Sequence, residues 1–419
     1  MDIRHLTTID DVSNEEVLMM FDAADVMSEK IEIKSKGHES LLDICAGYNM
    51  ASLFFEPSTR TRLSFESAMN RLGGNVISVT ETGSTSLAKG ETIADTARII
   101  GSYVDIIAVR HPCEGAPKVI ADYAGVSVIN AGDGAHQHPT QTLTDLYTLR
   151  KEKGQIEGIT VALCGDLKYG RTVHSLAYAL ARFKANMVLI SAHGLDMPDY
   201  IIKDLEFQYG CHREEINDVG QAFKKINSHS HKAERTSSTI WILSGLWGDL
   251  FKHSDGIPDI DAFYLTRVQK ERFADSGVTV EYPTFDAKLL KKIKQDAIVM
   301  HPLPRVDELA HEIDDDPRSA YFRQAAYGIP VRMALISFLL GVGPFSDVEG
   351  SVRHFPYQKP EFPRYENQTG VKCGNPKCVS MQESESRQIA PKFEIVPSDS
   401  GSLLRCVYCE RQISHCTVN

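Results

Sequence analysis

Hydroxyl and guanidinium groups lie close together between Phe54 and Phe65, where a strand is expected to lead into a helix; the polar residues there are Ser58, Thr59, Arg60, Thr61 and Arg62. An apolar run precedes them, and apolar residues spaced i, i+3, i+4 and i+7 follow as far as Gly73. A helix start offers unpaired N–H groups and the positive end of its dipole, and arginines can bind pairs of oxygens. A capped surface helix with solvated arginines is the alternative, but capping would use only one of the hydroxyls. The pattern therefore predicts a site for a phosphate-type anion.

Further cations and neutral donors follow other predicted strands. They are Ser86 and Lys89 in the Gly/Ser-rich loop 82–92, Arg110, His138 with Gln141, Lys168 with Arg171, Arg267 with Gln269, and Arg305. Open α/β sheets bind their ligands at the carboxyl ends of the strands. His138 and Gln141 are three residues apart at a helix start, so their side chains share one face. Taken alone, loop 82–92 is better explained as a flexible surface loop, and a lone histidine is more often structural.

These clusters contain no obvious nucleophile or general base. They suit a reaction with anionic substrates, in which positioning and hydrogen-bond donors stabilise a developing oxyanion without a covalent intermediate. The chain has no Gly-x-x-x-x-Gly-Lys-Ser/Thr loop, and no Gly-x-Gly-x-x-Gly follows a predicted strand. Enzymes that use ATP or a dinucleotide are therefore disfavoured, and no catalytic cofactor is expected.

Charge and hydropathy limit the partners and the cellular location. The 419 residues include 45 basic and 56 acidic side chains, for a net charge of −11, which argues against nucleic acid as the main partner. The first residues lack the layout of a signal peptide, and no apolar run approaches membrane-spanning length. We expect a cytoplasmic protein that does not bind membranes.

Five of the nine cysteines lie after residue 372. Four of them form two close pairs, Cys373 with Cys378 and Cys406 with Cys409. Two such pairs favour a closed, tetrahedral, structural Zn²⁺ site, and chance spacing of buried cysteines is the alternative. Since four thiolates complete the coordination shell, His415 and Cys416 are not expected to be ligands.

Short apolar runs alternate with helical patterns from Ser52 to about Phe345. The alternation predicts an α/β fold with two doubly wound parallel-sheet domains, whose border lies near the polar stretch 150–157. A last helical pattern at 331–340 is followed by a segment rich in Pro, Gly and charge. A small C-terminal zinc-binding β domain completes the predicted architecture.

Taken in order, these motifs resemble those of the aspartate carbamoyltransferase family over roughly residues 1–345. Ser58-Thr59-Arg60-Thr61 is similar to the carbamoyl phosphate signature shared by all carbamoyltransferases. Several features favour aspartate over ornithine as the acceptor. Glu56-Pro57 stands where the ornithine enzymes usually carry a lysine, His301-Pro302-Leu303-Pro304 replaces their His-Cys-Leu-Pro, and their Ser-Met-Gly element is not found. Arg267 and Gln269 match the aspartate-binding pair.

The resemblance implies a role for each site residue in making N-carbamoyl-L-aspartate and phosphate for pyrimidine biosynthesis. Carbamoyl phosphate would be bound by Ser58, Thr59, Arg60, Thr61, Arg110, His138 and Gln141, together with Ser86 and Lys89. The catalytic set would be Arg60, Thr61, Lys89, Arg110 and His138. L-Aspartate would be bound by Lys89, Arg171, Arg267, Gln269, Leu303 and Pro304.

The resemblance also implies a domain plan and an assembly. Residues 1–145 would bind carbamoyl phosphate and be completed by a helix at about 329–345, and residues 146–328 would bind aspartate. A linker at 346–365 leads to a zinc-binding domain, 366–419, similar to that of the regulatory chain of bacterial aspartate carbamoyltransferase. Because Ser86 and Lys89 reach a neighbouring subunit in this family, a homotrimer is expected, with larger assemblies left open.

Residues of about 210–258 make the chain longer than the family pattern leads us to expect. This predicted insert contains the apolar run Thr239–Trp247, which is either a strand or a partner surface. Two other functions remain open at this point: carbamoyl transfer to another amine, and an inactive scaffold with a zinc-ribbon interaction or nucleic-acid module. The second is weakened because no basic patch with interleaved aromatics surrounds the cysteines.

Overall fold

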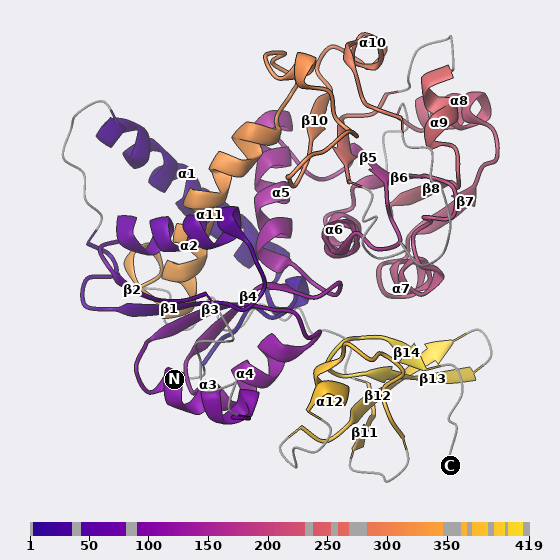
Figure 1. Ribbon diagram of the computed structural model, residues 1–419. Coiled ribbons are helices and arrows are strands. Elements are labelled where there is room, and N and C mark those ends of the chain that lie inside the picture. The colour runs from indigo at the N-terminus through magenta and orange to yellow at the C-terminus, as the bar shows by residue number, and fades with distance from the viewer. Residues whose placement is uncertain are drawn as a thin grey trace. The chain divides into compact units, whose positions relative to one another are not determined.

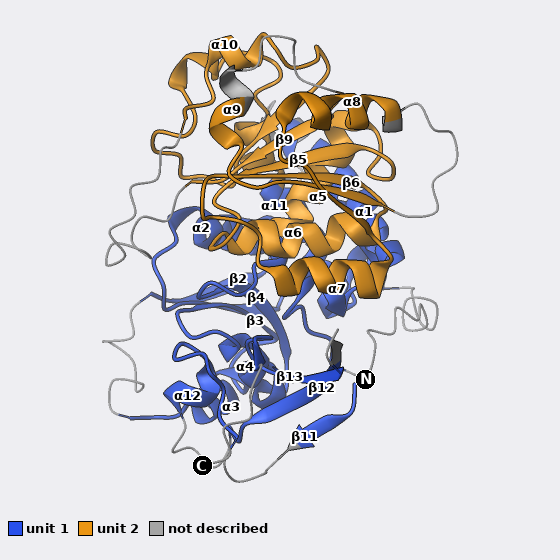
Figure 2. Ribbon diagram, turned by 90° about the vertical axis from the view of Figure 1, so that its right-hand side faces the viewer, with its two compact units in different colours: residues 1–140, 328–419 blue, residues 141–327 orange. Residues whose placement is uncertain are grey.

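The computed structural model describes residues 3–35, 43–80, 90–230, 238–252, 259–267, 283–346, 362–366, 371–383, 389–398 and 401–413. They divide into two compact units (Figure 2). Unit 1 comprises residues 1–140 and 328–419, and unit 2 comprises residues 141–327. Among the described helices, none is both long enough and apolar enough to span a bilayer.

Unit 1 is built on a four-stranded parallel sheet with the order β2-β1-β3-β4 (Figure 1). Its strands are β1 (Asn49–Phe54), β2 (Asn75–Val79), β3 (Ile106–His111) and β4 (Ser127–Asp133). The helices are α1 (Asn14–Ser35), α2 (Thr59–Arg71), α3 (Ile93–Gly101), α4 (Ala116–Ala124) and the later part of α11 (Tyr321–Leu340), with short 3₁₀ turns at Ile9–Asp11 and Gly343–Phe345. Strands β1, β3 and β4 are almost wholly buried, as expected for parallel strands with helices on both faces.

A small antiparallel sheet forms the C-terminal part of unit 1. Its order is β11-β12-β13-β14, with β11 at Arg364–Glu366, β12 at Lys392–Ser398, β13 at Gly401–Cys406 and β14 at Gln412–Ile413. One short helix, α12 (Val379–Gln382), accompanies it. Phe393 and Tyr408 of this domain belong to the same hydrophobic cluster as Val119 and Ile120 of α4. The C-terminal domain therefore shares a core with the parallel-sheet domain of its own chain.

Unit 2 holds a six-stranded parallel sheet with the order β10-β9-β5-β6-β8-β7. The strands are β5 (Thr160–Gly165), β6 (Asn186–Ser191), β7 (His212–Glu215), β8 (Thr239–Leu243), β9 (Ala262–Leu265) and β10 (Ile298–Met300). The helices are α5 (Pro139–Lys153, nearly all in this unit), α6 (Arg171–Arg182), α7 (Asp199–Tyr209), α8 (Val219–Ser230), α9 (Trp247–Lys252), α10 (Ala287–Leu290) and the start of α11, with a 3₁₀ turn at His311–Ile313. Two doubly wound sheets and a small β domain confirm the predicted fold class.

The segment 210–258 is integrated into the sheet of unit 2. It contributes β7, α8, β8 and α9, and β8 pairs with β6 on one side and β7 on the other. The apolar run Thr239–Trp247 is a strand with its following turn: Trp241 and Trp247 are both 1% exposed. It is therefore core, and the alternative of a partner surface is wrong.

Each parallel sheet has a point at which the strand order reverses. In unit 1 the chain runs from β1 outward to β2 and then continues on the other side at β3. In unit 2 it runs from β5 to β6, and β9 lies on the opposite side of β5. Loops that leave adjacent strands in opposite directions open a crevice at their carboxyl ends, where α/β sheets bind ligands. The loops after β1 and β3, and those after β5 and β9, are thus the places to look for sites.

Candidate active site

The junction of β1 and α2 has the form of an anion site. Ser58 is the N-cap of α2 with an extended backbone (φ −161°, ψ 96°), yet its hydroxyl makes no capping hydrogen bond. Thr59 and Arg60 are exposed, whereas Thr61 is buried. Although Arg60 is exposed overall, nearby atoms partly desolvate its guanidinium and lower its pKa. A helix start with an uncommitted hydroxyl and a desolvated cation favours a phosphate-like ligand.

Arg110 lies on the strand beside this junction. It is the register partner of Phe54, and its carbonyl accepts a hydrogen bond from the Phe55 N–H (2.9 Å). Its Nη2 pairs with Glu56 Oε2 at 2.9 Å, and its side chain is 11% exposed. Parallel pairing of β1 with β3 therefore brings this second guanidinium to the sheet edge where α2 begins. Glu56, which the sequence marked only as a family feature, is the residue that orients it.

His138 follows β4 at the start of α5 and is 4% exposed. Its Nδ1 lies 3.4 Å from the Thr140 hydroxyl, and a hydroxyl proton donated there would leave Nε2–H as the donor. The preceding turn is organised by Asp133, which is 1% exposed. Asp133 accepts hydrogen bonds from the backbone N–H groups of Gly115 (2.7 Å) and Gln137 (3.0 Å) and from the Asn130 amide (3.1 Å).

Gln141, in the first turn of α5, belongs to a buried network within unit 2. Its amide donates to Asp145 Oδ1 at 2.8 Å, and the Gln324 amide donates to the same oxygen at 2.6 Å. The Tyr264 hydroxyl donates to Asp145 Oδ2 at 2.9 Å, and Asp145 itself is fully buried. The carboxylate thus sets which way Gln141 points. Sequence reasoning missed Asp145, although its position one turn after Gln141 was a usable signal.

The loops that follow β5 and β9 carry the two arginines expected to bind a dicarboxylate. The Asp166 N–H donates to Thr266 Oγ1 (2.9 Å), and that hydroxyl donates to the Cys164 carbonyl (3.0 Å). These bonds join the loop before Arg171, the first residue of α6, to the loop that carries Arg267. Both arginines are partly exposed.

The Leu303–Pro304 segment is held by a buried histidine. His301 Nδ1 accepts the Leu303 N–H at 2.8 Å, so its Nε2–H donates to Glu308, also at 2.8 Å. Although burial alone would raise the pKa of Glu308, hydrogen bonding from His301 lowers it and keeps the carboxylate ionised. Leu303 has a left-handed backbone (φ 52°) before a cis peptide bond. A non-glycine residue held in this conformation is common at ligand sites.

The four C-terminal cysteines gather in one buried cluster whose sulfur atoms all lie within 4.8 Å of one another. Two of the separations are 3.5 Å (Cys373 to Cys409) and 3.7 Å (Cys378 to Cys406). Thiolates about 2.3 Å from a tetrahedral zinc ion lie about 3.8 Å apart, so the cluster fits such an ion.

The structure thus places most of the predicted residues at the two switch points or the loops beside them. In unit 1 these are Ser58, Thr59, Arg60, Thr61, Arg110 and His138; in unit 2 they are Gln141, Arg171, Arg267, Leu303 and Pro304. Ser86, Lys89 and Gln269 lie outside the described residues. The individual roles of all these residues stay predictions.

Comparison with protein families divides the chain into three matched regions. Residues 4–151 match the carbamoyl-P binding domain of aspartate/ornithine carbamoyltransferase, and residues 157–339 match the Asp/Orn binding domain. Residues 366–419 match the metal binding domain of the aspartate carbamoyltransferase regulatory chain. The bounds of the second match include the segment 210–258.

Individual relatives agree with these matches. The aspartate carbamoyltransferase catalytic subunit of Clostridium botulinum is 46% identical over 343 residues, covering 81% of this chain and 98% of its own. The aspartate transcarbamoylase of Trypanosoma cruzi, solved with carbamoyl aspartate and phosphate, is 37% identical with a TM-score of 0.64 over 80% of this chain and 94% of its own. The catalytic subunit from M. jannaschii is 41% identical with a TM-score of 0.63, over 83% and 100%.

We predict that Asp145→Asn destabilises the protein by about 2–3 kcal/mol, because an amide cannot accept from Gln141, Gln324 and Tyr264 together. Urea unfolding followed by tryptophan fluorescence measures the change. Asp199→Asn is the matched control: Asp199 is exposed and forms only surface ion pairs, so its loss should cost at most about 1 kcal/mol. Equal midpoints for the two variants would show that the buried network is not needed.

Proposed function

Because the chain belongs to the aspartate/ornithine carbamoyltransferase family, we propose that it is an aspartate carbamoyltransferase, which transfers the carbamoyl group of carbamoyl phosphate to the amine of L-aspartate. The observation that carries the proposal is the start of α2. Its N-cap hydroxyl makes no capping bond, and a partly desolvated arginine follows two residues later. A phosphate group is a ligand that such a helix start accommodates well.

In this proposal the phosphate of carbamoyl phosphate meets Ser58, Thr59, Arg60 and Thr61 at the start of α2. Arg110 and His138 then act on the carbamoyl carbonyl, Thr61 and Gln141 hold the carbamoyl group, and Arg60 acts on both parts. Support comes from the pairing of β1 with β3, which brings Arg110 to the edge where α2 begins. Glu56, Asp133 and Asp145 fix the orientation of these donors before the substrate binds. Donors that need no reorientation during the reaction stabilise an oxyanion most strongly.

The acceptor half uses Arg171 and Arg267 for the carboxylates of aspartate, since a guanidinium fork matches a carboxylate. Both follow strands at the switch point of unit 2. Gln269 and Lys89 join them in the proposal, and Leu303 and Pro304 contribute backbone groups. The crystal structure of the T. cruzi enzyme in complex with carbamoyl aspartate and phosphate supports this choice of substrates.

The proposed reaction is a direct transfer. The unprotonated amine of aspartate attacks the carbamoyl carbon, and its electron pair forms the new C–N bond while the carbonyl oxygen gains charge. The resulting tetrahedral intermediate expels phosphate by cleavage of the C–O bond. The departing phosphate takes up the amine proton, so no protein base is required. This fits a set of site residues that supplies donors and cations rather than nucleophiles.

Ser86 and Lys89 enter the proposal as residues of a neighbouring subunit, which makes a homotrimer the smallest active form. The assembly size and a cytoplasmic location are proposals from the sequence. Zinc is proposed as the metal of the four-cysteine cluster because Zn²⁺ prefers four tetrahedral thiolates in structural sites. Such an ion would cross-link the domain without taking part in the transfer.

Incubation with carbamoyl phosphate and L-aspartate should yield N-carbamoyl-L-aspartate and one equivalent of phosphate. His138→Ala should lower kcat by about 10²- to 10³-fold, because it removes a donor to the developing oxyanion. An exposed variant away from the site, Lys203→Ala, is the control and should keep full activity. L-Ornithine tested in place of aspartate separates the two acceptor classes. Product with ornithine but none with aspartate would refute the proposal.

Cys406→Ser should lose the bound metal, as measured by plasma mass spectrometry, and should weaken the assembly, as measured by light scattering. Cys211→Ser is the control, because Cys211 is a buried cysteine outside the cluster and should leave one metal ion per chain. A Cys406→Ser protein that retained both its metal and its assembly size would contradict a structural zinc site.

A further inference from the structure

The C-terminal domain lies against the loops that follow β3 and β4 in the same chain. The Glu114 N–H donates to the Lys377 carbonyl and the Val379 N–H to the Glu114 carbonyl, each at 2.9 Å. The Asn375 amide donates to the Glu114 carboxylate at 2.6 Å. Gly115, with φ +84°, would bring a Cβ within 2.6 Å of Tyr408, so only glycine permits this approach. The contact is close-packed and buried.

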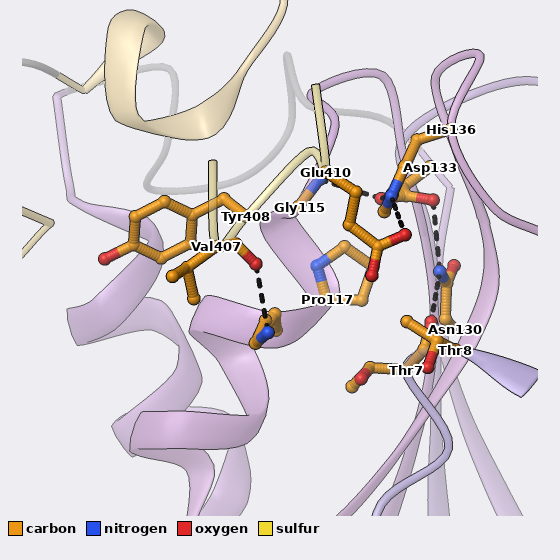
Figure 3. Close-up of a pocket in the computed structure, with 11 residues that line it drawn as sticks. Thr7, Thr8, Gly115, Pro117, Asn130, Asp133, His136, Val407, Tyr408 and Glu410 are labelled. Carbon is orange, nitrogen blue, oxygen red and sulfur yellow. Dashed lines mark hydrogen bonds and ion pairs between the residues drawn. The ribbon is translucent and has the colours of Figure 1, made fainter. Parts of the chain in front are cut away.

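Glu410 reaches from this domain to the turn that precedes His138. Its Oε2 lies 3.0 Å from His136 Nε2 and accepts a hydrogen bond from the Gln137 amide at 3.1 Å. Figure 3 shows the Glu410 side chain directed toward His136, with Asp133 beside the His136 ring and Asn130 below Asp133. The other ring nitrogen of His136 is 2.9 Å from Asp133. The imidazole therefore lies between a carboxylate of each domain.

Opposite charges on His136 and its two carboxylate partners stabilise this contact between the domains. Although burial alone would lower it, Asp133 and Glu410 raise the pKa of His136 to about 10. The ring is therefore charged at neutral pH and pairs with both carboxylates. Removing the Glu410 carboxylate would leave one ring N–H of the largely buried imidazolium without its acceptor, and an unsatisfied buried donor is costly.

The turn that carries Cys406 and Cys409 also includes the backbone of Glu410. This residue follows Cys409 directly, and its N–H donates to the Cys406 carbonyl at 3.0 Å, which closes the turn of the Cys-x-x-Cys segment. Its backbone is left-handed, with φ 57°, an uncommon conformation for a residue other than glycine. This backbone conformation sets the direction of the Glu410 Cα–Cβ bond, and the contacts with His136 and Gln137 hold the carboxylate. The chain of contacts thus runs from Cys409 through Glu410 to Gln137, whose neighbour is His138.

We propose that Glu410 is a positioning residue for the transfer reaction: by binding His136 and Gln137 it fixes the turn 133–138 and thereby the ring of His138. This inference rests on the proposed function, in which His138 donates to the carbamoyl oxygen. It assigns the metal-binding domain a part in catalysis within its own chain. Glu410 does not contact the substrates in this proposal. It acts by holding the His138 ring where its N–H can donate to the carbamoyl oxygen.

The test compares the steady-state kinetics of the full-length wild type, Glu410→Ala and Glu410→Gln. Glu410→Ala should lower kcat by about tenfold, because small displacements of a catalytic group are costly. Its KM for aspartate should stay within about twofold, because in the proposed reaction His138 acts on the carbamoyl oxygen and not on aspartate. Glu410→Gln should recover most of kcat, because its amide oxygen still accepts from Gln137. Metal content and mass in solution are measured on every sample.

Arg411→Ala is the matched control, because Arg411 is the exposed neighbour of Glu410 on the same turn. It should keep the wild-type kcat. A Glu410→Ala protein with unchanged kcat overturns the inference, and so does a Gln variant as impaired as the Ala variant. A wild type that makes no carbamoyl aspartate refutes the proposed function and this inference together, whereas an active wild type with an active Glu410→Ala refutes this inference alone.

If Glu410→Ala loses its metal, a second variant still tests the inference. Gln137→Met removes the partner on the other side of the contact and leaves the cysteines untouched. It should show the same loss of kcat with a full complement of metal. The double variant should be no worse than Glu410→Ala alone, because that variant already lacks the hydrogen bond between Gln137 and Glu410. Full activity of Gln137→Met overturns the inference.

Discussion

Buried carboxylates that must be fully hydrogen-bonded are the constraint on which the loops of this protein depend. Asp133, Asp145, Asp166 and Glu308 are each at most 1% exposed. An ionised carboxylate moved from water into a protein interior costs several kcal/mol unless donors surround it. Each of these groups therefore requires nearby N–H and O–H groups to turn toward it. The loops at the carboxyl ends of both sheets take the shapes that satisfy this demand.

The chemistry of the candidate site follows from that arrangement. Glu56 pairs with Arg110, Asp145 orients Gln141, and Glu308 orients His301 next to the Leu303–Pro304 segment. These carboxylates thus bind other residues of the protein, and the groups that can bind ligands are cations, amides and helix N–H groups. A site of this composition favours anionic substrates and a negatively charged transition state. It has no need of a nucleophile, which agrees with direct transfer between two bound substrates.

Patterns local in the sequence predicted the fold class, the anion site at the start of α2 and the four cysteines. Strand–helix alternation, a polar helix start and paired Cys residues are all visible within a few tens of residues. The positioning contacts could not be predicted, because they join distant segments: Tyr264 and Asp145 are 119 residues apart, and Glu410 and His136 are 274 apart. The burial of Thr239–Trp247 likewise depends on the strand order, which places β8 between β6 and β7. Only the assembled sheets reveal such neighbours.

Isotope exchange tests the central claim, that donors and cations alone support a direct transfer, most directly. The protein is incubated with carbamoyl phosphate and ³²P-labelled phosphate without aspartate, and label in carbamoyl phosphate is measured above an enzyme-free control. Direct transfer predicts no exchange until aspartate is added, because no carbamoyl group is ever held by the protein. Exchange in the absence of aspartate would reveal a carbamoyl-protein intermediate and would contradict the account.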